Sequence, residues 1–98
     1  MNQYHHKPKR VLDPDHLAAI RNEPCLVCES LKMRQMCPTE ADHITTRGAG
    51  GGDVKGNVWP QCTAHHAERH KTGIKTFIAR YWVLRLWLRK HGRDDLVG

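Results

Sequence analysis

The chain has 98 residues and a formal net charge of +6 at pH 7, so one domain and a polyanionic partner such as nucleic acid are expected. No apolar run is long enough to span a membrane, and the first residues lack the apolar stretch of a secretory signal, so we expect a cytoplasmic protein with reduced cysteines rather than a membrane or secreted one. A domain of this size has a small core, which a structural metal would stabilise.

The N-terminal region is expected to contain a basic arm followed by a short helix. Residues 1–12 are basic and patternless, and residues 13–98 are expected to form the single domain. Asp13 is a good N-cap, Pro14 suits the first helical turn, and Pro24 stops a helix. These signals predict a helix over "DPDHLAAIRNEP".

A hairpin and a helix are expected in the middle of the chain. Residues 24–30, "PCLVCES", predict a tight turn that presents two cysteines, and a polar connector follows. Residues 41–45 and 57–61 predict two short strands, joined by a glycine-rich loop that is either flexible or able to approach DNA closely. Helix-forming residues resume over 62–71.

The last helix is expected over about residues 74–91. Val83 and Trp87 fall on a second apolar face, which is either covered within the domain or used for a homodimer contact. The basic side chains of this segment either contact phosphates or face solvent. One apolar stripe falls at helical spacing and comprises Ile74, Phe77, Ile78, Tyr81, Leu84 and Leu88.

Two short ligand pairs, Cys25-x-x-Cys28 and Cys62-x-x-His65, predict a structural zinc site. Tetrahedral zinc takes four thiolate or imidazole ligands, and a two-residue spacer lets one turn present two of them. A redox cysteine pair and unmetallated core thiols are the alternatives. Cys37 is an alternative to His65 as the fourth ligand.

A second metal site is expected at Asp42, His66 and His70. The two histidines are four residues apart on a predicted helix and therefore share one face. One carboxylate and two imidazoles leave coordination positions open for water and phosphate oxygens, as in catalytic sites. The divalent ions that fit are magnesium, manganese, nickel and zinc.

Three polar residues close to this site are candidates for catalysis. His43 can take a proton from water, but neighbours on a strand point to opposite faces, so His43 and Asp42 are expected to serve one site only where the backbone is distorted. Asn57 opens the return strand and can pin the hairpin or touch the metal. Arg47 can brace a phosphate.

At these residues the sequence resembles the HNH, or ββα-metal, nucleases. The resemblance rests on "ADHI", "GNVWPQC" and "HHAERH", and the cysteine pairs resemble those of the zinc-knuckle subgroup. It implies an α+β fold in which a small zinc-stapled ββα-metal domain is flanked by N-terminal and C-terminal helices. It also implies that His43 is the general base and Asn57 orients it, while the catalytic ion is held by Asp42, His66 and His70. The first ligand is often a histidine in colicin-type relatives, and some relatives use only the Asp and the Asn.

The expected activity is hydrolysis of DNA phosphodiester bonds, leaving a 5′ phosphate and a 3′ hydroxyl as the resemblance implies. A monomer would nick one strand, whereas a homodimer through the last helix could cut both. The alternatives are a zinc-dependent nucleic-acid-binding module without catalysis and a zinc-based protein adaptor. No base-reading pattern is recognisable, so weak sequence preference is expected. Small free-standing units of this kind resemble phage and prophage examples, which suggests a bacterial host cell.

Overall fold

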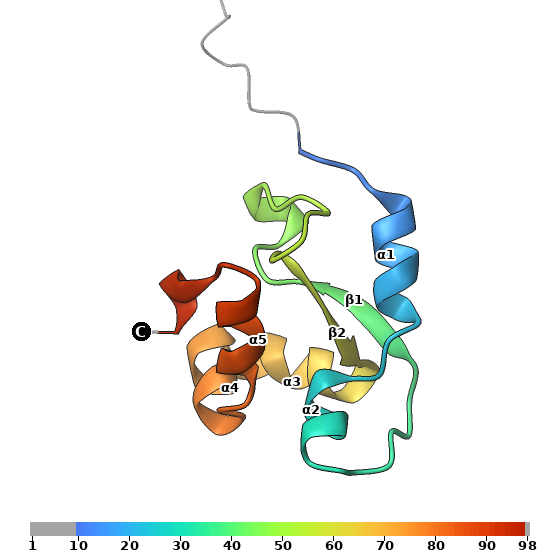
Figure 1. Cartoon of the computed structure of the whole chain (residues 1–98), viewed down its shortest axis with the longest axis vertical. Helices are drawn as coiled ribbons and strands as arrows, with labels where there is room; N and C mark the ends of the chain where they lie inside the picture. Colours follow the sequence, from blue (N-terminus) through green and yellow to red (C-terminus); the bar gives the residue numbers. More distant parts are fainter. Residues whose placement is uncertain (1–9, 98) are drawn as a thin grey trace, which may run out of the picture.

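An antiparallel pair of strands lies at the centre of the molecule (Figure 1). The computed structural model describes residues 10–97, so most of the predicted basic arm lies outside the described residues. Strand β1 (Thr39–His43) pairs with β2 (Val58–Cys62), and Asp42 lies opposite Trp59. Both predicted strands are confirmed, although β1 begins two residues before the expected start and ends before Ile44.

The two faces of this sheet are covered by different helices (Figure 1). Helix α1 (Pro14–Arg21) packs on the face that carries Ala41 and Val58, through Leu17 and Ile20. Helix α3 (Thr63–Thr72) follows β2 directly and contacts the face that carries Glu40 and Asp42. The described residues therefore form a small α+β fold in which a two-stranded sheet lies between helices.

Helix α1 begins as the sequence predicts. The Asp13 side chain accepts a hydrogen bond of 3.0 Å from the main-chain N–H of His16, and Pro14 occupies the first turn. The predicted tight turn over 24–30 is wrong, because residues Leu26–Ser30 form the short helix α2. Burial of Val27 and Cys28 in the core stabilises this short helix. Local helix propensity alone does not predict it.

The predicted single helix over 74–91 is also wrong. It is divided into α4 (Ile74–Arg80) and α5 (Leu84–Lys90), and Tyr81 between them has a non-helical backbone, with φ −119° and ψ 74°. An unbroken helix of this length would extend about 27 Å along a straight line. The break instead lets α4 and α5 both pack their apolar residues on the same small core.

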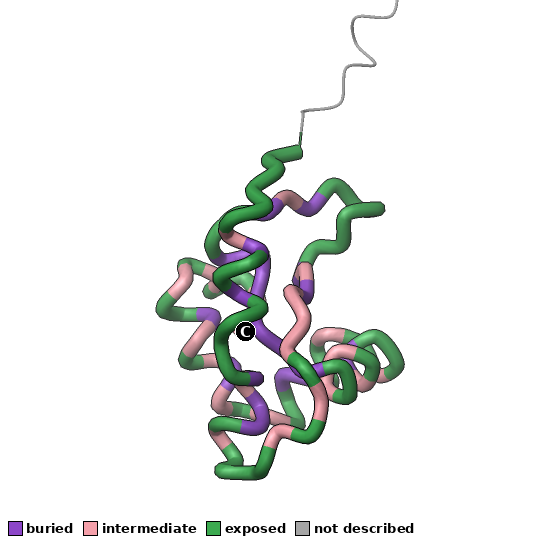
Figure 2. Tube along the Cα trace, turned by 90° about the vertical axis from the view of Figure 1, so that its right-hand side faces the viewer, coloured by how far each residue is buried: buried purple, intermediate pink, exposed green. Residues whose placement is uncertain are grey.

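The buried residues are marked along the Cα trace in Figure 2. Trp59 on β2 is fully buried and belongs to that core. Its ring lies 6.3 Å from Phe77 of α4 and 5.6 Å from Trp87 of α5, measured between ring centroids. Trp87, on the second apolar face of the C-terminal segment, thus packs against the core, although it and Val83 are only half-buried. Leu86 on α5 is exposed, and the homodimer contact stays a prediction.

Two short 3₁₀ helices complete the described secondary structure: η2 (Arg47–Ala49) in the glycine-rich loop and η3 (Asp94–Leu96) near the C-terminus. Among residues 10–97, no helix is both long and apolar enough to cross a bilayer. The cytoplasmic location stays a prediction.

Candidate metal centres and adjoining cleft

Three cysteines and one histidine meet where α2, β2 and α3 converge. Nδ1 of His65 lies 3.4 Å from Sγ of Cys25, 3.6 Å from Sγ of Cys28 and 3.3 Å from Sγ of Cys62. Tetrahedral zinc, with bonds of about 2.3 Å to sulfur and about 2.0 Å to nitrogen, separates its ligand atoms by about 3.5–3.8 Å. The cluster can therefore hold a structural metal such as zinc.

The surroundings of the cluster suit a cation. Cys25, Cys28 and Cys62 are buried and unpaired by disulfides. The pKa of Cys28 is raised to about 12, chiefly by burial and then by its neighbour Cys25. Thiolates form in such a place only with a compensating positive charge, which a divalent ion supplies.

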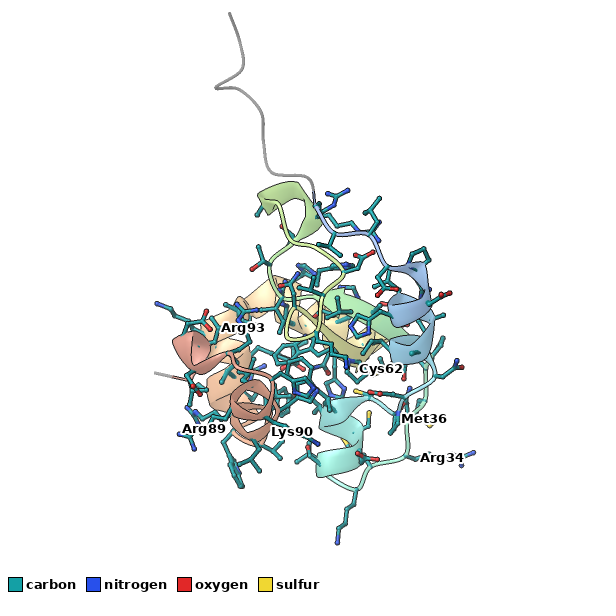
Figure 3. All side chains as sticks on the ribbon, turned by 45° about the horizontal axis from the view of Figure 1, so that its top comes forward. Arg34, Met36, Cys62, Arg89, Lys90 and Arg93 are labelled. Carbon is teal, nitrogen blue, oxygen red and sulfur yellow. The ribbon has the colours of Figure 1, made fainter. Side chains whose placement is uncertain are left out.

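The position of Cys37 decides between the two candidates for the fourth ligand. Cys37 lies outside the four-residue cluster, and its sulfur accepts a hydrogen bond of 3.4 Å from the main-chain N–H of Ala64. His65 completes the cluster from the first turn of α3. Figure 3 shows Cys62 next to the short helix α2, which carries the other cysteine pair.

A second cluster is formed by Asp42 at the centre of the sheet and two histidines on α3. Ligand atoms of Asp42, His66 and His70 all lie within 4.8 Å of one another. Nε2 of His66 lies 3.2 Å from Oδ1 of Asp42 and 3.1 Å from Nε2 of His70. The four-residue spacing thus places both imidazoles on the sheet-facing side of α3.

Asp42 is fully buried, and its two oxygens have different surroundings. Oδ2 accepts a hydrogen bond of 2.7 Å from the indole N–H of Trp59, which lies opposite it in the hairpin. Oδ1 has no hydrogen-bond partner among residues 10–97 and faces the histidines. A buried carboxylate oxygen without a donor is costly, so this oxygen fits a cation held between it and the imidazoles.

Glu40 fixes the orientation of His66. Its Oε1 lies 2.8 Å from Nδ1 of His66, and this hydrogen bond lowers the pKa of Glu40. A carboxylate accepts, so Nδ1 carries the proton and Nε2 presents a lone pair to Asp42. This is the carboxylate–histidine arrangement that commonly supports a metal ligand. Glu40 was not predicted to be a site residue, although its position two residues before Asp42 places both side chains on one face of a strand.

His70 is held in a form that suits a ligand. Burial and the positive charge of Arg69 lower the pKa of His70, which favours the neutral imidazole. Arg69 itself is buried in the same region and donates a hydrogen bond of 3.0 Å to the main-chain oxygen of His43. It ties the end of β1 to α3 and thereby sets the distance between the parts of the cluster.

A cleft of about 180 Å³ lies beside this cluster. His43 is the last residue of β1 and keeps regular strand pairing, so the expected backbone distortion is absent there. His43 and Asp42 both line the cleft, which lies at the end of β1. Its lining consists of Ala41, Asp42, His43, Thr46, Arg47, His66 and His70.

The glycine-rich loop folds back onto the hairpin and is held there by hydrogen bonds. A Cβ on Gly51 would lie 1.7 Å from the main-chain oxygen of Thr45, so only glycine fits. The Asn57 side chain accepts from the N–H of Thr45 and donates to the main-chain oxygens of Thr45 and Gly52, at 2.8–3.1 Å. Asn57 therefore pins the hairpin, as one of its expected roles requires, and Gly51 allows a close approach within the chain. Close approach of the loop to DNA stays a prediction.

Asp53, at the end of this loop, is a site residue that sequence reasoning missed. It is 2 % exposed, and its Oδ1 lies 2.7 Å from Nε2 of His43. Its Oδ2 accepts a hydrogen bond of 3.0 Å from the main-chain N–H of Asp13, which lowers the pKa of Asp53. No local pattern links residues 43 and 53, because the path of the loop alone brings them together.

Comparison of the chain with protein-family models, with curated proteins and with solved structures gave no match. Membership of the HNH family therefore stays a prediction that rests on the short motifs.

Proposed function

We propose that this chain is a metal-dependent DNA endonuclease of the HNH type. The observation that carries the proposal is the meeting of three metal-ligand side chains with His43 and Arg47 around one cleft. They come from β1, η2 and α3, and the order β1, β2, α3 along the chain is the order of the ββα-metal unit. A binding module has no need for this combination of ligands and an ionisable base.

Asp42, His66 and His70 would hold the catalytic ion, because their donor atoms converge and Oδ1 of Asp42 has no hydrogen-bond partner in the described part of the chain. A divalent ion at this point supplies positive charge for the phosphate and the leaving 3′ oxygen. Trp59 and Glu40 keep the carboxylate and one imidazole in their orientations. The ligands are therefore in place before substrate arrives.

His43 acts as the base that takes a proton from the attacking water. It lines the cleft but is not part of the ligand cluster, so its ring is left for proton transfer. Arg47 lines the same cleft from the start of the glycine-rich loop, and half of its side chain is exposed. Its guanidinium can contact a phosphate oxygen and hold the backbone of the substrate.

DNA is the substrate that the charge favours. The net charge is +6, and the cleft is open to solvent rather than enclosed, as a strand-sized substrate requires. Binding is expected to weaken steeply with salt, because neutralised phosphates release counterions. The zinc cluster would hold α2 against the junction of β2 and α3. It would thereby help to keep Asp42 of the sheet close to the two histidines of α3.

The test is a supercoiled-plasmid cleavage assay. Magnesium, manganese, nickel or zinc is added to protein in which the cluster of Asp42, His66 and His70 carries no metal. Wild-type protein should cleave with at least one ion, and His43→Ala should lose at least about 100-fold in rate, as expected for removal of a general base. Zinc content and thermal melting of His43→Ala should match wild type. His16→Ala, a histidine outside both clusters, is the matched control and should cleave normally.

Two results would count against the proposal. Undiminished cleavage by His43→Ala would remove His43 from the mechanism. Salt-sensitive DNA binding without cleavage, with any of the four ions, would instead support a zinc-dependent nucleic-acid-binding module.

A further inference from the structure

The contacts of Asp53 are all with groups that surround the cleft or close the loop. Oδ1 lies 2.7 Å from Nε2 of His43 and 3.6 Å from the guanidinium of Arg47. Oδ2 accepts from the main-chain N–H of Asp13, and the main-chain N–H of Asp53 donates to Val11 at 2.8 Å. The carboxylate is thus fixed from both sides and cannot turn away from His43.

These contacts determine which nitrogen of His43 carries the proton. The buried carboxylate accepts hydrogen bonds, so Nε2 of His43 is the donor. Nδ1 is then the nitrogen with the lone pair, and within residues 10–97 no hydrogen bond engages it. The ring can accept a proton only through Nδ1.

We propose that Asp53 is the positioning residue of the base: it holds His43 in the tautomer with hydrogen on Nε2 and leaves Nδ1 to receive the proton of water. The inference rests on the proposed nuclease function and adds a residue to it. It also makes the segment around Val11 and Asp13 part of the site, because their main-chain groups hold Asp53.

The Asp53→Asn variant separates this role from a role in folding. The main-chain N–H of Asp13 is a fixed donor, so the amide oxygen of the variant will face it. The amide NH₂ then faces Nε2 of His43, which must become the acceptor. The proton moves to Nδ1, while the size of the side chain and the fixed loop are unchanged. In the variant, His43 is thus in the tautomer with hydrogen on Nδ1, while the rest of the site is unchanged.

The kinetic test compares Asp53→Asn with wild type in single-turnover cleavage of a short duplex. We expect the cleavage rate to fall at least about 100-fold, the range of general-base catalysis, with the Kd for DNA unchanged within about twofold. Asp94→Asn removes the same charge from an exposed residue that does not line the cleft and should behave as wild type. Cleavage by Asp53→Asn at the wild-type rate would overturn the inference.

The second test reads the tautomer directly, and its measurement on wild type does not depend on the folding of any variant. Long-range ¹H–¹⁵N correlation spectra at about pH 8.5, where an ordinary histidine is neutral, distinguish hydrogen on Nε2 from hydrogen on Nδ1. Wild type should show His43 protonated on Nε2, and Asp53→Asn should show it on Nδ1. A wild-type ring protonated on Nδ1 refutes the role of Asp53 even if the protein cleaves DNA. A correct tautomer in a protein that cleaves no DNA refutes the nuclease function instead.

Discussion

Replacement of Cys28 by serine tests whether the Cys₃His cluster holds a metal that the fold requires. Cys28 is buried in the main core cluster, together with Cys25 and Cys62. A structural zinc site in a small domain contributes about 10–16 kcal/mol at neutral pH. The whole free energy of unfolding of such a domain is about 5–15 kcal/mol. Loss of the metal should therefore leave the chain largely unfolded at 25 °C.

The measurements are zinc content by elemental analysis and unfolding followed by near-UV circular dichroism. The latter reports on the three tryptophans, of which Trp59 and Trp87 pack against each other in the core. Wild type should carry one zinc at the cluster and unfold when a strong chelator removes it. Cys28→Ser should carry none there and lack the near-UV signal before any chelator is added.

Cys37→Ser is the matched control, since Cys37 lies near the cluster but outside it. A serine hydroxyl can accept the same hydrogen bond from Ala64, so zinc content and melting temperature should be close to those of wild type. The reasoning would be refuted by a Cys28→Ser protein that melts within a few degrees of wild type. Loss of zinc from Cys37→Ser would refute the assignment of His65 as the fourth ligand.

Three further predictions concern stability. Tyr81→Phe removes a hydrogen bond of 2.8 Å to the Glu68 carboxylate and should lower the free energy of unfolding by about 1–2 kcal/mol in urea titrations of the zinc-loaded protein; no change would contradict the anchoring of this bend. Gly51→Ala should destabilise by at least about 2 kcal/mol in the same titration because its Cβ meets main chain, whereas Gly48→Ala, with open space, should be neutral. The pKa of Asp53 lies below its ordinary value of 3.8, chiefly because of the bond from the main chain of the N-terminal segment, so its stabilising effect is complete above about pH 4 and lost as pH falls further. The stability difference between wild type and Asp53→Asn should accordingly shrink in acid, and a constant difference from pH 6 to pH 3 would contradict this.

Features set by local backbone geometry were predictable from the sequence. A two-residue spacer in a turn, a four-residue spacer on a helix and the alternation of a strand each fix where side chains point. They were sufficient to group Cys25 and Cys28 with the Cys62–His65 pair, with Cys37 left as an alternative to His65, and to place His66 and His70 on one face. The N-cap at Asp13 and both strands followed from equally local signals.

Other features depend on which surfaces are buried together. The C-terminal segment has an unbroken apolar stripe, yet it bends at Tyr81 because two short helices cover the core around Trp59 better than one long helix. The turn that carries Cys25 becomes a helix because Val27 is buried. Neither the bend at Tyr81 nor the helix α2 can be predicted from local sequence patterns alone.

The sequence by itself predicted the members of both clusters, apart from the choice between Cys37 and His65, because their spacing is a property of the local chain. Only the tertiary structure decided which residue forms a hydrogen bond with the ring of His43. Asp53 reaches it through a loop whose course is fixed by Gly51, by the amide of Asn57 and by contact with the segment before α1. Such contacts join residues distant in sequence, and their geometry follows from the packing of the whole chain.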